Sequence, residues 1–139
     1  MTRTPATRIM QRAVATVALL FGLMTVIAGG RIAVGLADPG YVVFRPLLLY
    51  NTAMGFAYLA AGVLLWRNLR QGRVAAGVIV VLNVMVLAGI IAIFAGGGAV
   101  APDSLRAMSL RTVVWLALFA AATYLHRLRS NRPAAALEG

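Results

Sequence analysis

Arginines near the ends of long apolar segments are the residues in this chain best placed to bind a ligand. The guanidinium group is planar and donates two parallel hydrogen bonds, which suits it to carboxylates and phosphates. A tyrosine and an asparagine at a similar level extend the hydrogen-bonding set. Together they predict an outward-facing pocket for an anionic lipid, a carboxylate or a quinone-like amphiphile, in a transporter or a redox accessory. The residues assigned to this pocket are Arg31, Arg45, Tyr50, Asn51, Arg106 and Arg111.

General membrane physics favours a plainer interpretation of the same arginines. Arginines at helix ends extend toward lipid phosphates and pair with nearby acids, here Asp38 and Asp103. Arg111 fits this least well, because residues 112–126, which separate it from Arg127, cover only about 22 Å as a helix. The hydrocarbon core is about 30 Å thick. Arg111 must therefore either extend its side chain to the interface or lie within the outer leaflet beside a partner or a wet cavity.

Two other polar residues lie deep inside apolar segments. Tyr58 and Asn83 each fall about 12–13 Å from the polar turn that joins their segments, if both segments are helical. The two helices would run antiparallel, so their side chains could meet. We predict that Asn83 forms a hydrogen bond across the bundle with Tyr58 as its leading partner, in a structural role.

The sequence lacks the residues that most enzymes and cofactor proteins need. It has no cysteine and no lysine, and its only histidine is His126. Thiol chemistry, Schiff bases and a two-histidine haem site within one chain are therefore excluded. The three acids, Asp38, Asp103 and Glu138, lie outside the middle of the apolar runs, which disfavours carboxylate-pair catalysis and proton-coupled export. We expect no catalytic residues, no cofactor and no metal.

The elements that would hold these residues are apolar helices. Apolar residues make up 62% of the 139 and charged residues 12%, against roughly 45–50% and 25% in soluble domains, and the mean hydropathy is +0.90. About 20 mostly apolar residues cross a bilayer as a helix. We expect spans at 13–37, 46–66, 74–95 and 105–126, separated by Asp38-Pro39-Gly40, a polar turn at 67–73 and three glycines at 96–98. Asp103 or Ser104 would cap the fourth helix. The sequence thus predicts an all-α integral membrane protein, a bundle of four transmembrane helices with short loops, forming one domain over 1–139.

The arginines also predict the orientation. Nine of the thirteen lie in the N-terminal segment, the polar turn at 67–73 and the C-terminal tail, which an even number of spans puts on one side. The positive-inside rule then places both termini in the cytoplasm, in a bacterial inner membrane. The rival interpretation is a cleaved signal peptide in residues 1–37. Its apolar run is longer than the usual 7–15 residues and is interrupted by Arg31.

Small residues at four-residue spacing predict how the helices pack. Lipid is as apolar as leucine, so membrane helices associate by close approach and polar contacts. We expect these stripes to pack within the bundle, with a homo-oligomer contact as the alternative. They are Ala18 and Gly22; Ala53, Ala57 and Ala61; Ala88, Ala92 and Gly96; and Ala117 and Ala121.

The leading function expected from the sequence is non-enzymatic. The chain would be an integral subunit or helix-packing partner of a larger membrane assembly, or a homo-oligomer, in contact with membrane lipids and other transmembrane helices. Ligand binding at the arginine pocket is the alternative, and nucleic-acid binding is not expected because topology explains the arginine clusters. Residues 57–85 resemble the middle hairpin of DoxX-like small bacterial membrane proteins over about a fifth of the chain. No function is carried over from this resemblance, which includes no diagnostic motif.

Overall fold

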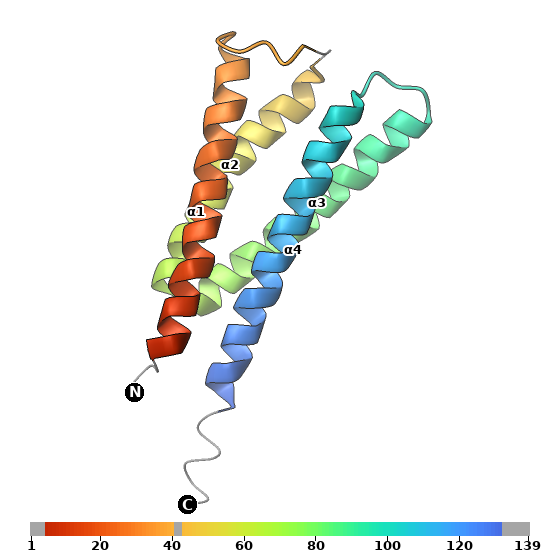
Figure 1. The fold of residues 1–139 in the computed structure, drawn as a ribbon. Helices are drawn as coiled ribbons and strands as arrows, with labels where there is room; N and C mark the ends of the chain where they lie inside the picture. Colours follow the sequence, from red (N-terminus) through yellow and green to blue (C-terminus); the bar gives the residue numbers. More distant parts are fainter. Residues whose placement is uncertain (1–4, 41–42, 132–139) are drawn as a thin grey trace, which may run out of the picture.

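The computed structural model describes residues 5–40 and 43–131, and within them all regular structure is α-helical (Figure 1). The helices are α1 (Pro5–Ala33), α2 (Arg45–Arg67), α3 (Leu69–Ala95) and α4 (Pro102–Ser130). The predicted all-α class and the number of helices are therefore confirmed. By length and composition, all four are long and apolar enough to cross a membrane.

Both ends of α1 differ from the predicted span at 13–37. The helix is described from Pro5, eight residues before the predicted start. It ends at Ala33, four residues earlier than predicted. Gly35 adopts a left-handed conformation with φ of 75°, and Leu36 N–H turns back to the carbonyl of Arg31 at 2.8 Å. This is the usual glycine termination of a helix.

The polar turn predicted at 67–73 is almost entirely helical, so that prediction was wrong. A single residue, Asn68, separates α2 from α3. Its side-chain oxygen accepts hydrogen bonds from the backbone N–H groups of Arg70 and Gln71 at 3.1 and 3.4 Å, which caps α3. Gly72 permits the tight reversal, because a Cβ there would lie 2.5 Å from the Cα of Leu65.

The start of α4 also differs from the prediction. Asp103 and Ser104 were expected to cap the helix, but Ala101 holds the cap position and Pro102 occupies the first turn. Asp103 lies inside that first turn, where an acid suits the helix dipole. The earlier start matters for the site below, because it moves Arg111 further from the beginning of α4.

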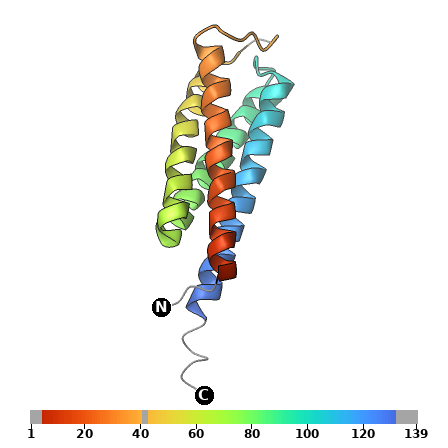
Figure 2. The same cartoon turned by 60° about the vertical axis from the view of Figure 1, so that its left-hand side comes forward.

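The helices run alternately up and down. The α1–α2 and α3–α4 connections lie at one end of the molecule, here called the loop end. The start of α1, the α2–α3 turn and the end of α4 lie at the other, the termini end (Figure 1 and Figure 2). The packing is most extensive between α1 and α2 and sparse between α1 and α4. In Figure 1, α1 and α4 diverge toward the loop end.

Glycines let α1 and α2 approach closely. A Cβ added at Gly22 of α1 would lie 2.9 Å from the backbone nitrogen of Leu59. A Cβ added at Gly62 of α2 would lie 3.0 Å from the backbone nitrogen of Leu19. Backbones this close leave no room for a side chain, and this is how membrane helices gain contact without a hydrophobic driving force.

The predicted small-residue stripes are only partly inside the bundle. Ala18, Gly22 and Ala61 are buried and Ala57 and Ala121 half-buried, as expected for bundle packing. The prediction was wrong for the remaining members, because those parts of the helices face outward. The exposed members are Ala53, Ala88, Ala92, Gly96 and Ala117.

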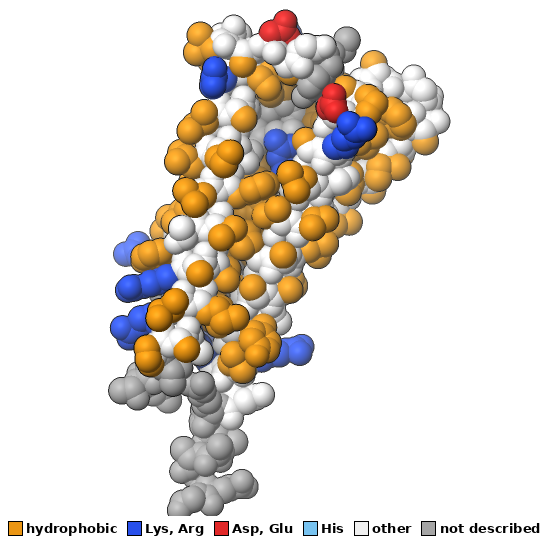
Figure 3. Space-filling model, viewed as in Figure 1, with side chains coloured by type: hydrophobic (Ala, Val, Ile, Leu, Met, Phe, Trp, Pro, Cys, Tyr) orange, Lys and Arg blue, Asp and Glu red, His pale blue; other side chains and the backbone are white. Residues whose placement is uncertain are grey.

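Large apolar side chains cover the outside of the helices. In Figure 3, hydrophobic side chains extend over the middle of the visible face, while basic side chains lie mainly toward the two ends. The core proper is small, and its largest fully buried side chains are Trp115, Tyr58, Leu65, Met108, Leu125 and Asn83. Three of these six, Trp115, Tyr58 and Asn83, carry polar groups that become important at the site.

Candidate functional site

A cavity of about 90 Å³ lies between α1, α2 and α4 toward the loop end. Three polar residues line it: Asn51 from α2, with Ser104 and Arg111 from α4. The rest of the wall is apolar, and none of the described residues that line it is acidic. A cation, an amide and a hydroxyl in an apolar setting are the features of a site that binds a small anionic group.

Pairs of arginines mark two levels along the helices. On α1, Arg12 and Arg31 are about 28 Å apart along the helix axis, and on α2, Arg45 and Arg67 are about 33 Å apart. Both separations match a hydrocarbon core of about 30 Å. All four arginines are exposed. They lie where arginines at the ends of membrane spans are expected.

The same rise of about 1.5 Å per residue places Arg111 inside the span of α4. On α4, Arg106 and Arg127 are about 32 Å apart, so they occupy the two boundary levels. Arg111 follows Arg106 by about 7–8 Å along the axis toward the middle of the bundle. Unlike those two arginines it is half-buried.

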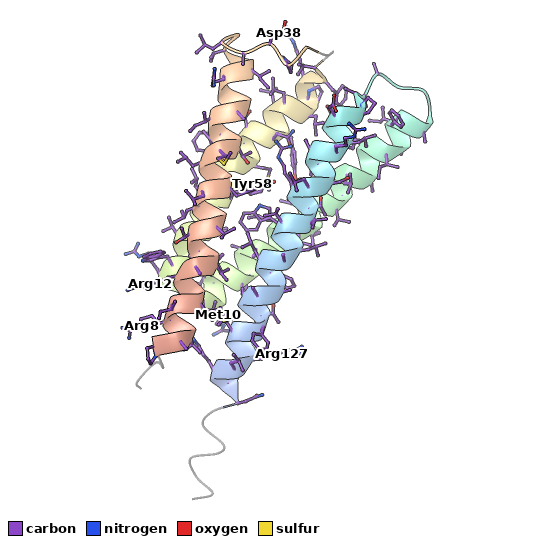
Figure 4. The ribbon with its side chains drawn as sticks, in the orientation of Figure 1. Arg8, Met10, Arg12, Asp38, Tyr58 and Arg127 are labelled. Atoms are coloured by element: carbon purple, nitrogen blue, oxygen red, sulfur yellow. The ribbon has the colours of Figure 1, made fainter. Side chains whose placement is uncertain are left out.

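Tyr50 and Tyr58 both donate hydrogen bonds to the side-chain oxygen of Asn83. The distances are 3.1 Å from Tyr50 and 3.0 Å from Tyr58. Asn83 and Tyr58 are fully buried, and Tyr58 lies at mid-height of the bundle in Figure 4. The network joins α2 to α3. The predicted contact between Tyr58 and Asn83 is present, and Tyr50, which sequence reasoning had assigned to the arginines, shares it.

Aromatic rings surround this network. The ring of Tyr58 lies 5.9 Å from that of Phe21 and 4.8 Å from that of Trp115, centre to centre. Trp115 follows Arg111 by one helical turn on α4, so the cation lies at the edge of an aromatic, hydroxyl-bearing interior. Sequence reasoning missed Trp115. The available signal was its four-residue spacing from Arg111, which places both on one face of a helix.

Three buried polar atoms in this region form no hydrogen bond with the described residues. They are the side-chain nitrogens of Asn83 and Trp115 and the side-chain oxygen of Asn51. The two nitrogens are donors and the oxygen is an acceptor, and none of the described residues that line the cavity carries a carboxylate. Of these three residues, only Asn51 lines the cavity.

Four of the six predicted pocket residues do not line the cavity. One of them, Tyr50, bonds to Asn83 instead. Arg31 and Arg106 are exposed, and Arg106 pairs with Asp103 at 3.4 Å on the surface. Arg45 lines a separate recess of about 550 Å³ at the loop end together with Asp38. Their positions correspond to the plainer interpretation of helix-end anchors. The prediction of one pocket with all four arginines was wrong, because four residues on three helices need matched rotations that spacing along the chain does not fix.

The termini end is held by a polar link that sequence reasoning also missed. Gln11 is 3% exposed, and its nitrogen donates to the carbonyl of Leu65 at 2.5 Å. Its oxygen accepts from the guanidinium of Arg129 at 2.6 Å. This joins α1, α2 and α4. The guanidinium of Arg12 also lies 5.5 Å from the ring centre of Trp66. Arg8, Arg12 and Arg127 lie toward this end, opposite Asp38 (Figure 4).

The arrangement supplies what anion binding needs. His126, the only histidine, lies half-buried near the termini end of α4, well away from the cavity. Within residues 5–40 and 43–131, no three metal-ligating side chains come together. The cavity itself offers a guanidinium, an amide and a hydroxyl.

Comparison of this chain with protein-family models, with curated proteins and with solved structures gives no significant match.

Proposed function

We propose that this protein binds the anionic headgroup of a membrane amphiphile at Arg111, without catalysing a reaction on it. The observation that carries the proposal is the position of Arg111, about 7–8 Å inside the level marked by Arg106 and in the wall of a cavity. Ionisable residues within membrane spans are costly and typically mark ligand sites or pathways. In a low dielectric, the attraction between a guanidinium and an anion is much stronger than in water.

The size of the cavity supports a headgroup rather than a whole ligand. Pockets for complete small molecules measure roughly 300–1,000 Å³, whereas this one measures about 90 Å³. A carboxylate or a phosphate group fits that volume. The remainder of such a ligand must lie outside the cavity.

We further propose that the protein lies in a bacterial inner membrane with both termini in the cytoplasm. Nine arginines belong to the two terminal segments and the α2–α3 turn, against four in the remainder of the chain. Arginine bias of this kind orients membrane proteins with the richer side inward. The cavity, which lies toward the loop end, would then open to the outer leaflet.

A binding titration in nanodiscs tests the proposed function. The probe is oleate, a single-chain carboxylate, and oleyl alcohol is the uncharged control. Loss of charge-assisted hydrogen bonds costs about 1.5–3 kcal/mol, so we expect Arg111→Gln to weaken oleate binding about 10- to 100-fold. Arg106→Gln, one boundary arginine on the same helix, should change it less than about 3-fold, because exposed charges contribute little. Equal effects of the two variants, or equal binding of oleate and oleyl alcohol, would refute the proposal.

The outer face of α3 supports a second candidate, an integral subunit of a larger membrane assembly or a homo-oligomer. Ala88, Ala92 and Gly96 are exposed along α3, and α3 is the least buried of the four candidate spans. Small residues permit the close approach of another helix. Native mass spectrometry from nanodiscs tests this candidate. It predicts a dimer or a stoichiometric partner that Ala92→Trp releases, and a wild-type protein that is strictly monomeric would contradict it.

A further inference from the structure

We infer that the ligand enters the cavity sideways from the bilayer, through the gap between α1 and α4, and keeps its hydrocarbon chain in lipid while bound. This inference rests on the proposed function and names the ligand class more narrowly. It requires a lipid-like molecule with a carboxylate or phosphate at one end, and it excludes a fully water-soluble anion as the cognate ligand.

The first support is the make-up of the cavity's two side walls. From α1 they include Ala28 and Gly29, and from α4 they include Ser104 and Ala107. All four side chains are small, and Ala28 is exposed on the outside of the bundle. The two helices make few contacts with each other and diverge toward the loop end (Figure 1). The small residues on these two helices make the α1–α4 side of the cavity the proposed entrance next to Arg111.

The second support is the size of the cavity, which is small compared with a lipid-like ligand. Its volume of about 90 Å³ is well below the roughly 300–1,000 Å³ of pockets that enclose a whole small molecule. A chain attached to a bound headgroup must leave either through the α1–α4 gap or through the recess at the loop end. Exposure of each methylene to water is unfavourable, so the chain takes the route that stays in lipid.

The recess at the loop end is the alternative route, and its mostly apolar lining includes two charged residues. It is lined in part by Asp38 and Arg45, both exposed. It shares Ile32, Val43 and Leu48 with the cavity, so the two are neighbours. Water or a soluble anion can approach Arg111 from this side. The two openings therefore predict different behaviour for tailed and untailed anions.

Variants that narrow one route at a time test the inference. Ala28→Phe and Ala107→Phe narrow the gap, and Ala33→Trp narrows the recess, in whose wall Ala33 is exposed. Ala53→Phe, an exposed alanine on α2 that lines neither cavity nor recess, is the matched control. Oleate in nanodiscs is the tailed probe. Inorganic phosphate in the buffer is the untailed probe, measured by the rise it causes in the melting temperature.

We expect Ala28→Phe to weaken oleate binding at least 10-fold, while Ala33→Trp and Ala53→Phe change it less than 3-fold. Stabilisation by phosphate should persist in Ala28→Phe and disappear in Arg111→Gln. Ala107→Phe serves as the second gap variant, and Ala28 is far enough outside the core that its variant is expected to fold. Loss of oleate binding in Ala33→Trp but not in Ala28→Phe would overturn lateral entry and leave the anion site standing. Oleate binding that is unaffected by Arg111→Gln would instead overturn the proposed function.

Discussion

At the scale of single residues, Asn83 is the polar centre of the molecule. It is fully buried on α3, and its oxygen accepts from the hydroxyl groups of both Tyr50 and Tyr58 on α2. The network joins the two helices of the central hairpin at a depth where water cannot substitute for a lost partner. Sequence reasoning identified Asn83 and Tyr58 from their matching depths. It did not predict the hydrogen bond from Tyr50 to Asn83. Two tyrosines eight residues apart reach one oxygen only when α2 has a particular rotation about its axis.

Replacement of Asn83 tests how much this hydrogen-bond network contributes to the free energy of unfolding. Asn83→Leu keeps a similar volume and removes both hydrogen bonds, and such bonds contribute about 0.6 kcal/mol each in membranes. We expect a loss of about 1–2 kcal/mol in the free energy of unfolding, measured by titration with a denaturing detergent. Tyr50→Phe removes one bond and should cost about half as much. A Tyr50→Phe variant that is destabilised as much as Asn83→Leu would contradict the assignment of two independent bonds.

At the scale of helices, close approach at glycine decides how the first hairpin packs. Sequence reasoning chose small-residue stripes in all four helices and included Gly22. It missed Gly29, Gly55 and Gly62, where α1 and α2 also approach closely. Four-residue spacing identifies a face, and it does not tell whether that face meets a helix or lipid. The ends of α1, α3 and α4 were also placed inaccurately, because single residues decided them: Gly35, Asn68 and Pro102.

Two glycine-to-alanine changes separate packing from helix propensity. In Gly62→Ala the new Cβ would lie 3.0 Å from the backbone nitrogen of Leu19, and overpacking of this kind costs about 1–3 kcal/mol. In Gly89→Ala the new Cβ meets nothing within 4 Å, and alanine is favoured over glycine in a helix by up to about 1 kcal/mol. We expect Gly62→Ala to lower the free energy of unfolding and Gly89→Ala to raise it. Stabilisation of both variants would show that α1 and α2 are not in close contact at Gly62.

At the scale of the whole molecule, the number of helices and their alternating direction followed from hydropathy, because about 20 apolar residues in a row have few other stable arrangements. The site was less predictable. Sequence reasoning grouped Arg31, Arg45, Arg106 and Arg111 by their common end of the bundle, and only Arg111 lines the cavity. The depth of a residue along its helix follows from counting residues. The direction in which its side chain points depends on how the helix is rotated about its axis. That rotation is set by packing across the bundle.

Labelling of introduced cysteines tests the proposed orientation. The chain has no native cysteine, so a single substitution gives a clean signal. Asp38→Cys lies exposed at the loop end and Gln71→Cys lies exposed near the α2–α3 turn. We expect a membrane-impermeant thiol reagent to label Asp38→Cys in cells whose outer membrane alone is permeable, and to label Gln71→Cys only after the inner membrane is opened. The reverse pattern would place the cavity toward the cytoplasm.

The anion site itself is tested most directly by a crystal structure grown in a lipid phase with a fatty acid that carries bromine near its carboxylate. The anomalous signal of bromine locates the chain independently of the protein. We predict that the carboxylate lies against the guanidinium of Arg111, with bromine in the gap between α1 and α4. Bromine found only along the outer faces of the helices, with no acceptor oxygen within hydrogen-bonding distance of Arg111, would contradict the account.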